Sequence, residues 1–124
     1  MSNKFKILVV EDNDFVRMQI CSFINDAGHD TVEATDGEQA LDAINGDIAL
    51  AVVDVRMEPM GGFEFITAIR ADNIKTPVML VTGDDDPYLL SEASKHGVVA
   101  ILKKPVQKDR LIKMISRVLG VDNG

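Results

Sequence analysis

Short apolar runs alternate with longer amphipathic stretches along the chain. The apolar runs predict five strands, at residues 6–10, 30–34, 48–53, 77–81 and 98–103. The amphipathic stretches predict helices at residues 14–27, 37–44, 62–71, 87–96 and 107–119. The first, third and fourth strands are almost entirely apolar, which is typical of parallel strands buried on both faces. The alternation therefore predicts an α/β fold, a doubly wound parallel sheet with helices on both faces.

Local signals mark the ends of several predicted helices. Asp86 followed by Pro87 predicts an N-cap with proline at the first helical position. Gly28 and Gly97 stand where left-handed C-terminal caps are expected. These signals support the helix ends near residues 27, 87 and 96.

Helical periodicity predicts which faces the first and last helices bury. The last helix can cover the sheet with an apolar stripe and its flank, made of Leu111, Ile112, Ile115, Val118 and Leu119. The first helix collects on one face Val16, Ile20, Phe23, Ile24 and Ala27. Phe15 and Met18 point away from that face, so they are either a docking surface or ordinary exposed side chains.

Composition narrows the class of protein. The 124 residues suit a single domain covering residues 1–124, and the net charge of −7 argues against a nucleic-acid-binding surface. The lone cysteine, Cys21, cannot form an internal disulfide, and the N-terminus has no apolar signal core, so we expect a cytoplasmic protein. No apolar stretch approaches the length of a membrane-spanning helix, and no membrane partner is expected.

Polar residues follow four of the predicted strands. Glu11 and Asp12 follow the first strand, Asp54 ends the third, Thr82 the fourth and Lys104 the fifth. In an open α/β sheet, ligands bind beyond the carboxyl ends of the strands, where these side chains would converge. Taken singly, each has a structural explanation: the acids as helix or turn caps, the threonine as a strand-end residue and the lysine as a surface charge.

Taken together, these residue types indicate phosphoryl chemistry. Three carboxylates offer hard oxygen ligands for Mg²⁺, which commonly bridges protein carboxylates to a phosphate oxygen. Asp54 could then act as a nucleophile and form an acyl phosphate, with Lys104 and the Thr82 hydroxyl stabilising the transferring group. We expect at least one carboxyl of the empty site to have a raised pKa, because like charges repel, and Mg²⁺ to raise the melting temperature.

The chain resembles the receiver domain of bacterial two-component response regulators over essentially its whole length. The resemblance rests on matching motifs in matching order: Val9-Val10-Glu11-Asp12-Asn13, Val53-Asp54-Val55-Arg56-Met57, Gly62, Thr82-Gly83 and Lys103-Lys104-Pro105. It implies a flavodoxin-like sheet of order 2-1-3-4-5 and Mg²⁺-dependent acceptance of a phosphoryl group by Asp54.

The resemblance also implies roles for individual residues. Asp12 and Asp54 would be metal ligands, Glu11 would act mainly through water, and the backbone carbonyl of Arg56 would complete the metal site. The peptide before Pro105 would be cis. The partners would be a sensor histidine kinase or phosphotransferase and a downstream protein target, and the domain would be a phosphoacceptor and not an enzyme, although it would assist its own phosphorylation and dephosphorylation. We expect a monomer or weak dimer.

Four positions depart from the usual pattern of the family. The proline after the acceptor is Pro59, one position later than usual, so the loop is expected to curve differently. Ile101 stands where an aromatic switch residue is common, so a ring-flip mechanism cannot operate there. Arg56 and Asp84 flank the expected site entrance, and we hypothesise a weak ion pair between them. Gly83, which belongs to the matching Thr82-Gly83 motif, either leaves space beside the phosphoryl group or only permits a tight loop.

Other functions remain as alternatives. A receiver module cut from a hybrid kinase or larger regulator would look the same, although the start at Met1 and the short tail after the last helix favour a free-standing protein. A flavin- or nucleotide-binding protein of this topology would need a glycine-rich phosphate loop where Glu11 and Asp12 stand. An aspartyl-phosphate phosphohydrolase would need an acid where Arg56 stands. His29 and His96 are expected to stabilise helix ends or face solvent.

Overall fold

Strands and helices alternate through a computed structural model that describes residues 4–83 and 87–120. The strands are β1 (Lys6–Val10), β2 (Asp30–Ala34), β3 (Ile48–Asp54), β4 (Val78–Thr82) and β5 (Ala100–Lys103). The helices are α1 (Asp14–Asp26), α2 (Gly37–Ala43), α3 (Gly62–Ala71), α4 (Pro87–Lys95) and α5 (Lys108–Leu119). The predicted elements are confirmed, and most ends that differ do so by a single residue.

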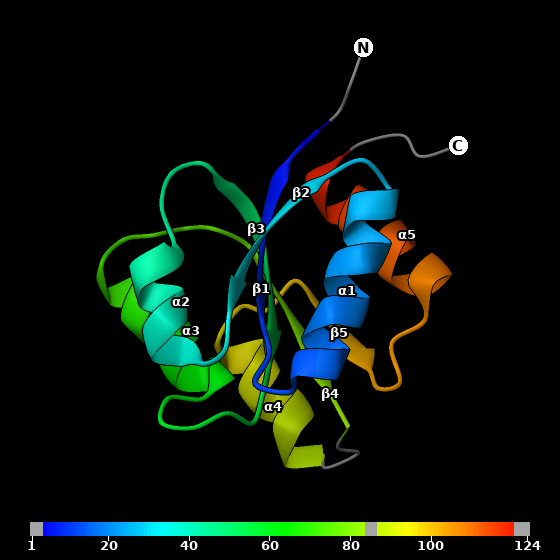
Figure 1. Cartoon of the computed structure of the whole chain (residues 1–124). Coiled ribbons are helices and arrows are strands. Elements are labelled where there is room, and N and C mark those ends of the chain that lie inside the picture. The colour runs from blue at the N-terminus through cyan, green and yellow to red at the C-terminus, as the bar shows by residue number, and fades with distance from the viewer. Residues whose placement is uncertain (1–3, 84–86, 121–124) are drawn as a thin grey trace.

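The strands form one parallel sheet in the order β2-β1-β3-β4-β5, as the resemblance implied. Figure 1 shows α1 and α5 on one face of this sheet and α2, α3 and α4 on the other. The fold is therefore the predicted doubly wound α/β arrangement. None of the helices in the two described segments is long and apolar enough to cross a membrane.

Two apolar cores lie on the two faces of the sheet. Strand residues alternate between them, so that Leu8 and Val10 of β1 enter one core and Ile7 and Val9 enter the other. The core beneath α2, α3 and α4 includes Phe65, which is fully buried. Burial on both faces explains why β1, β3 and β4 have almost continuously apolar sequences.

Helix α5 covers its face of the sheet as predicted. Leu111 and Ile115 are fully buried, and Ile112, Val118 and Leu119 pack against the same core. The prediction for α1 is partly wrong: Ala27 lies beyond the helix and is exposed, whereas Cys21, which was not assigned to the buried face, is buried. Phe15 and Met18 are exposed, as the periodicity predicted.

Helix ends follow the local signals where the structure describes them. Gly28 and Gly97 have the predicted left-handed conformation, with φ of 95° and 67°. Helix α1 is capped by the side chain of Asn13, which accepts a hydrogen bond from the Val16 amide at 3.0 Å. Neither acid of the Glu11-Asp12 pair therefore caps this helix. The predicted N-cap, Asp86, lies outside the described residues.

Candidate functional site

The register of the sheet brings the predicted polar residues to one edge. Val10 pairs with Val53 on the neighbouring strand, so Glu11 and Asp54 each lie one residue further along. Asp54 pairs with Val81 of β4. Thr82 therefore lies one residue beyond Asp54's partner, at the carboxyl end of the next strand.

The same register places the lysine of the fifth strand. Thr82 pairs with Lys103, so Lys104 is the first residue past the paired part of β5. The Lys104 amide donates to the Thr82 carbonyl at 2.8 Å, and the peptide between Lys104 and Pro105 is cis, as the resemblance implied. The lysine thus leaves the sheet at the same edge as the acids.

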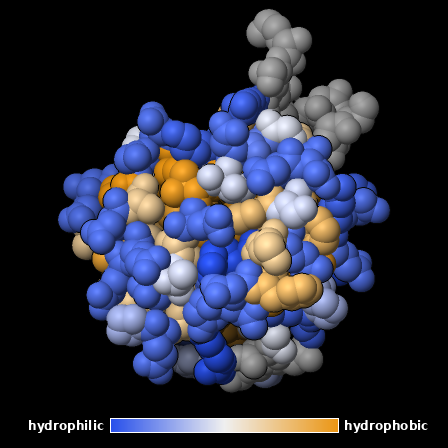
Figure 2. All heavy atoms as spheres, in the orientation of Figure 1, coloured by the Kyte–Doolittle hydropathy of each residue, from blue (hydrophilic) through white to orange (hydrophobic). Residues whose placement is uncertain are grey.

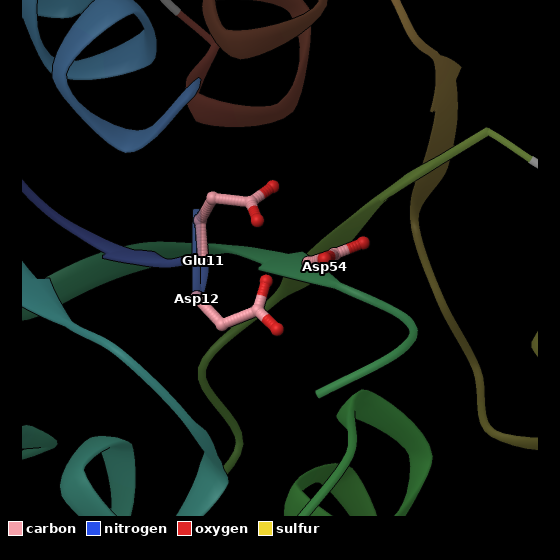
Figure 3. Close-up of side chains that lie close together, drawn as sticks. All are labelled: Glu11, Asp12 and Asp54. Atoms are coloured by element: carbon pink, nitrogen blue, oxygen red, sulfur yellow. The ribbon is translucent and has the colours of Figure 1, made fainter. Parts of the chain in front are cut away.

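Three carboxylates meet at this edge. Figure 3 shows Glu11 and Asp12 projecting from the end of β1 toward the side on which Asp54 leaves β3. Carboxylate oxygens of the three residues all lie within 4.8 Å of one another. Glu11 and Asp54 are buried, and Asp12 is exposed. The cluster is therefore open to solvent on the side of Asp12, whereas Glu11 and Asp54 are shielded from solvent.

The Lys104 ammonium lies between the two buried acids. Its Nζ atom is 2.9 Å from Glu11 Oε1 and 3.4 Å from Asp54 Oδ2. The contact with Glu11 is an ion pair without hydrogen-bond geometry, so Oε1 has no hydrogen-bond partner among the described residues. The Lys104 charge thus faces two of the three clustered carboxylates, and the negative charge of the cluster favours a further cation there.

Burial and charge shift the protonation equilibria of the site. Burial raises the pKa of Asp54, and contact with Lys104 opposes this shift only in part. Desolvation, and then the contact with Glu11, raises the pKa of Asp12. Burial alone would lower the pKa of Lys104, but its contacts with Glu11 and Asp54 raise it. The predicted raised carboxyl pKa is confirmed, with desolvation and not repulsion as the first cause.

Close packing fixes the backbone around Asp54. A Cβ atom at Gly62 would lie 2.6 Å from the Asp54 carbonyl oxygen, and the Gly62 amide donates to the Val55 carbonyl at 3.0 Å. The Val55 amide in turn donates to Val81 at 3.3 Å. Glycine at position 62 thus allows α3 to begin directly against the end of β3.

A groove of about 480 Å³ opens beside the exposed acid. Its walls come from the end of β1, the loop after β3 and the first turns of α3 and α4: Asp12, Val55, Arg56, Met57, Glu58, Gly61, Phe63, Glu64, Tyr88 and Leu89. Arg56, in the loop that follows β3, therefore borders the same space as Asp12. The hypothesised ion pair of Arg56 stays a prediction, because Asp84 lies outside the described residues.

Oxygen ligands for a hard cation are present at this edge. The carboxylates of Glu11, Asp12 and Asp54 match the ligand type that Mg²⁺ prefers, and their mutual spacing allows one ion to contact them. The buried Glu11 Oε1 atom has no hydrogen-bond partner among the described residues, although the Lys104 ammonium lies 2.9 Å from it. The donor set therefore fits Mg²⁺.

Two features of the surroundings were not predicted. Arg17 of α1 donates to the Glu11 carbonyl at 2.7 Å and contacts Asp14, three residues earlier on the helix. The Asp14–Arg17 spacing could have indicated the second contact but not the first. Tyr88 lines the groove although its side chain is strongly exposed, and nothing in the sequence pattern distinguished it.

Neither histidine belongs to the acidic cluster or lines the groove, and one prediction about them is wrong. His29 does not face solvent: it is buried, accepts a hydrogen bond from the Phe5 amide at 3.1 Å, and has its pKa lowered by burial. His96 lies at the end of α4, with Nδ1 2.7 Å from the Glu92 carbonyl oxygen and its ring against Phe63. His96 therefore matches the predicted role at a helix end.

Ile101 is partly buried in β5 and packs against the core beneath α2, α3 and α4. It pairs with Leu80, two residues before Thr82 on the neighbouring strand. The position carries a branched aliphatic side chain with no ring to rotate. Movement of a ring at this position is therefore excluded by the residue itself.

Comparisons with known proteins agree with this geometry. A family model described as "Response regulator receiver domain" matches residues 7–116. Chemotaxis protein CheY of Pseudomonas aeruginosa is 35% identical over 123 residues, which cover 93% of this chain and 99% of the relative. The structure of chemotaxis protein CheY4 of Vibrio cholerae superposes with a TM-score of 0.86 at 32% identity, covering 94% of this chain and 99% of that one.

Other relatives are longer proteins. Transcriptional regulatory protein FixJ of Bradyrhizobium diazoefficiens is 34% identical over 93% of this chain, which spans 57% of the relative. A cyclic di-GMP phosphodiesterase of Thermotoga maritima is 31% identical over 91% of this chain, which spans 30% of it. The matched segment is thus a part of several larger chains.

Proposed function

This chain belongs to the response regulator receiver domain family, which serves phosphorelay signalling, and we propose that Asp54 is its phosphoacceptor. The observation that carries the proposal is the position of the Asp54 carboxylate. It is buried at the edge of the sheet, clustered with Glu11 and Asp12, and 3.4 Å from Lys104. These contacts leave a carboxylate oxygen beside both a cation and a potential metal site.

The proposed reaction transfers a phosphoryl group from a phosphohistidine to Asp54. A carboxylate oxygen attacks the phosphorus, the new O–P bond forms as the P–N bond breaks, and the released imidazole takes up a proton. In this reaction Lys104 would offset the negative charge of the phosphoryl oxygens, and the Thr82 hydroxyl would donate a hydrogen bond to one of them. The Lys104 ammonium would then contact the phosphoryl oxygens in place of part of its contact with the Asp54 carboxylate.

Glu11, Asp12, Asp54 and the backbone carbonyl of Arg56 would hold Mg²⁺, with Glu11 acting mainly through water. When bound, the ion supplies positive charge to the transferring phosphoryl group. The carboxylate oxygens of the cluster, which lie within 4.8 Å of one another, support this assignment. The strand ends of the fold hold these three carboxylates close together although their negative charges repel one another.

The partners follow from the family. The proposed donor is a sensor histidine kinase or phosphotransferase, and the proposed output is altered binding of a downstream protein target. The exposed Phe15 and Met18 of α1 lie on the helix that begins beside the acids, which suits contact with a donor. A cytoplasmic location and a monomeric or weakly dimeric state stay predictions from the sequence.

Receiver segments occur in relatives of different lengths. This chain covers nearly all of the Pseudomonas chemotaxis protein but only part of FixJ, whose name describes a transcriptional regulator. We propose that residues 1–124 form one receiver domain, whether it acts alone or as part of a larger regulator. The specific output of this chain depends on the protein that its phosphorylated surface contacts.

Phosphoryl incorporation tests the proposed function. Wild-type protein incubated with Mg²⁺ and a small acyl phosphate should gain one phosphoryl group by intact mass, because Asp54 is the acceptor. Asp54→Asn should gain none. Asp47→Asn, which changes an exposed aspartate just before β3, should behave as wild type. An unmodified wild type, or equal modification of Asp54→Asn, would disprove the proposal.

A further inference from the structure

Arg17 connects three parts of the chain around the acidic site. Its side chain is only 13% exposed although it lies on the outer part of the fold. Nη1 donates to the backbone carbonyl of Glu11 at 2.7 Å, Nη2 to Asp14 at 2.6 Å and Nε to Glu33 at 3.0 Å. One guanidinium thus joins the end of β1, the first turn of α1 and the fourth residue of β2.

The charge of Arg17 is balanced by acids outside the site. Its hydrogen bond to Asp14 raises its pKa, burial opposes that shift, and Glu33 reinforces it. The guanidinium therefore already faces two carboxylates of its own, and it adds little positive charge to the cluster of Glu11, Asp12 and Asp54. Its remaining contribution to the site is the hydrogen bond to the Glu11 carbonyl.

That hydrogen bond completes the fixing of Glu11. The Glu11 amide donates to the Ala34 carbonyl at 3.1 Å, and Glu11 Oε2 accepts from the Asn13 amide at 3.0 Å. With Arg17 on the carbonyl, the backbone of this residue is held on both sides of its Cα atom. Because Asp12 follows directly, the same contacts determine where the exposed acid lies.

We propose that Arg17 is a positioning residue for the metal site, which holds the Glu11–Asp12 backbone so that both carboxylates face Asp54. The inference rests on the proposed Mg²⁺ site. A planar guanidinium suits this task because its donors point in fixed directions and can serve three acceptors at once. A lysine ammonium at the same position keeps the charge but cannot reach all three acceptors in that geometry.

The test is the affinity for Mg²⁺ alone, measured from amide chemical shifts during titration of the full chain without phosphodonor. Arg17→Gln should weaken Mg²⁺ binding about 10-fold, the lower end of the usual effect of losing a group that orients metal ligands. Arg17→Lys should give an intermediate affinity. A purely structural role would lower the midpoint of urea unfolding and leave the Mg²⁺ affinity unchanged.

Arg70→Gln is the matched control. Arg70 also donates to a backbone carbonyl, that of Ile74 at 2.8 Å, but from the last turn of α3, far along the helix from Asp54. Arg70→Gln should lower the free energy of unfolding without changing the affinity for Mg²⁺. If Arg17→Gln fails to fold, Arg17→Lys and Glu33→Gln carry the test, because each loosens the guanidinium network while leaving a cation at position 17.

The outcomes separate the two proposals. If wild type and Arg17→Gln bind Mg²⁺ with equal affinity, the positioning role is overturned and the proposed metal site stands. Wild type whose site amides do not respond to Mg²⁺ overturns the proposed metal site and the positioning role together. Equal weakening in Arg17→Gln and Arg70→Gln also overturns the positioning role, because it would reflect general loss of stability.

Discussion

Lys104 is the residue whose contacts determine the electrostatic state of the site. Its side chain is 27% exposed, and its ammonium lies against Glu11, whose side chain is 1% exposed. Removing a cation from a buried acid leaves an uncompensated charge, which costs more than losing a pair in water. The fold thus depends on this lysine most when no metal ion is bound.

Lys104→Met should therefore destabilise the Mg²⁺-free domain by about 1 to 3 kcal/mol, below the range for fully buried pairs because the lysine side chain is partly exposed. Urea unfolding measures this change, and added Mg²⁺ should reduce it. Lys108→Met is the control, since its 3.1 Å pair with Asp26 is exposed and should contribute about 0 to 1 kcal/mol. Equal losses in both variants would show that Lys104 acts as an ordinary surface charge.

His29 gives the stability a pH dependence. Burial lowers its pKa in the folded state, so the unfolded chain binds a proton more readily. The contribution of neutral His29 to the free energy of unfolding is complete above its pKa in the unfolded chain, about 6.5. It is lost as the pH falls toward the lower pKa of His29 in the folded state. Protonation of Nδ1 would also remove the acceptor for the Phe5 amide.

Unfolding free energies of wild type and His29→Gln, measured between about pH 7.5 and 5.5, test this assignment. The wild type should lose more stability than the variant on acidification. Parallel curves for wild type and His29→Gln would assign the pH dependence to other groups.

The acids and the lysine of the site could be predicted because each combines a residue type with a position at a strand end. Glu11, Asp54 and Lys104 are of this kind. Arg17 could not be found in this way, since its contact with the site is made through a backbone carbonyl. His29 was misjudged because its burial depends on Phe5, which precedes the first strand.

At the scale of elements, the junction between β3 and α3 is the most constrained part of the site. Helix α3 begins at Gly62, where an added Cβ atom would lie 2.6 Å from the Asp54 carbonyl oxygen. Backbone atoms on both sides cannot move aside as a flexible side chain could. The start of α3 and the position of Asp54 are therefore coupled.

Gly62→Ala should destabilise the domain by about 1 to 3 kcal/mol, the usual cost of overpacking, and should slow phosphorylation by displacing Asp54. Urea unfolding and the rate of modification by an acyl phosphate measure these effects. Gly46→Ala is the control, because a Cβ atom there has no heavy atom within 4 Å. Wild-type behaviour of Gly62→Ala would mean that this junction adapts without affecting Asp54.

Element types followed from periodicity, whereas some element ends did not. The largest difference is at β5, which begins at Ala100 although the apolar run begins at residue 98. Val98 and Val99 precede the strand. The Val98 amide donates to the Ala93 carbonyl at the end of α4, and the Val99 amide donates to the Val78 carbonyl just before the β4–β5 pairing begins. Apolar character alone cannot distinguish a strand from the turn leading into it.

At the scale of the whole molecule, the fold gathers residues from the ends of β1, β3, β4 and β5 at one edge of the sheet. Strand order could not be obtained from periodicity, because each strand looks alike in that pattern. It came from the family resemblance. The face of the molecule in Figure 2 is mainly hydrophilic, with apolar side chains in separate patches, consistent with the charged composition.

Mg²⁺ should stabilise the whole domain, because it binds acids that only the folded chain brings together. At 100 times its dissociation constant, the ion would add about 2.7 kcal/mol to the free energy of unfolding. Thermal unfolding across a Mg²⁺ series measures this effect. Asp12→Asn should reduce it, and Asp36→Asn, which alters the N-cap of α2, should not. A melting temperature unaffected by Mg²⁺ would contradict the proposed metal site.

The measurement that most directly tests the central claim is chemical mapping of the phosphorylated residue. Borohydride reduces an aspartyl phosphate to homoserine, which peptide mass spectrometry can locate. After incubation with Mg²⁺ and an acyl phosphate, we predict homoserine at position 54, the buried acid that contacts Lys104. Conversion at Asp12, or at an acid outside the cluster, with Asp54 intact would contradict the account.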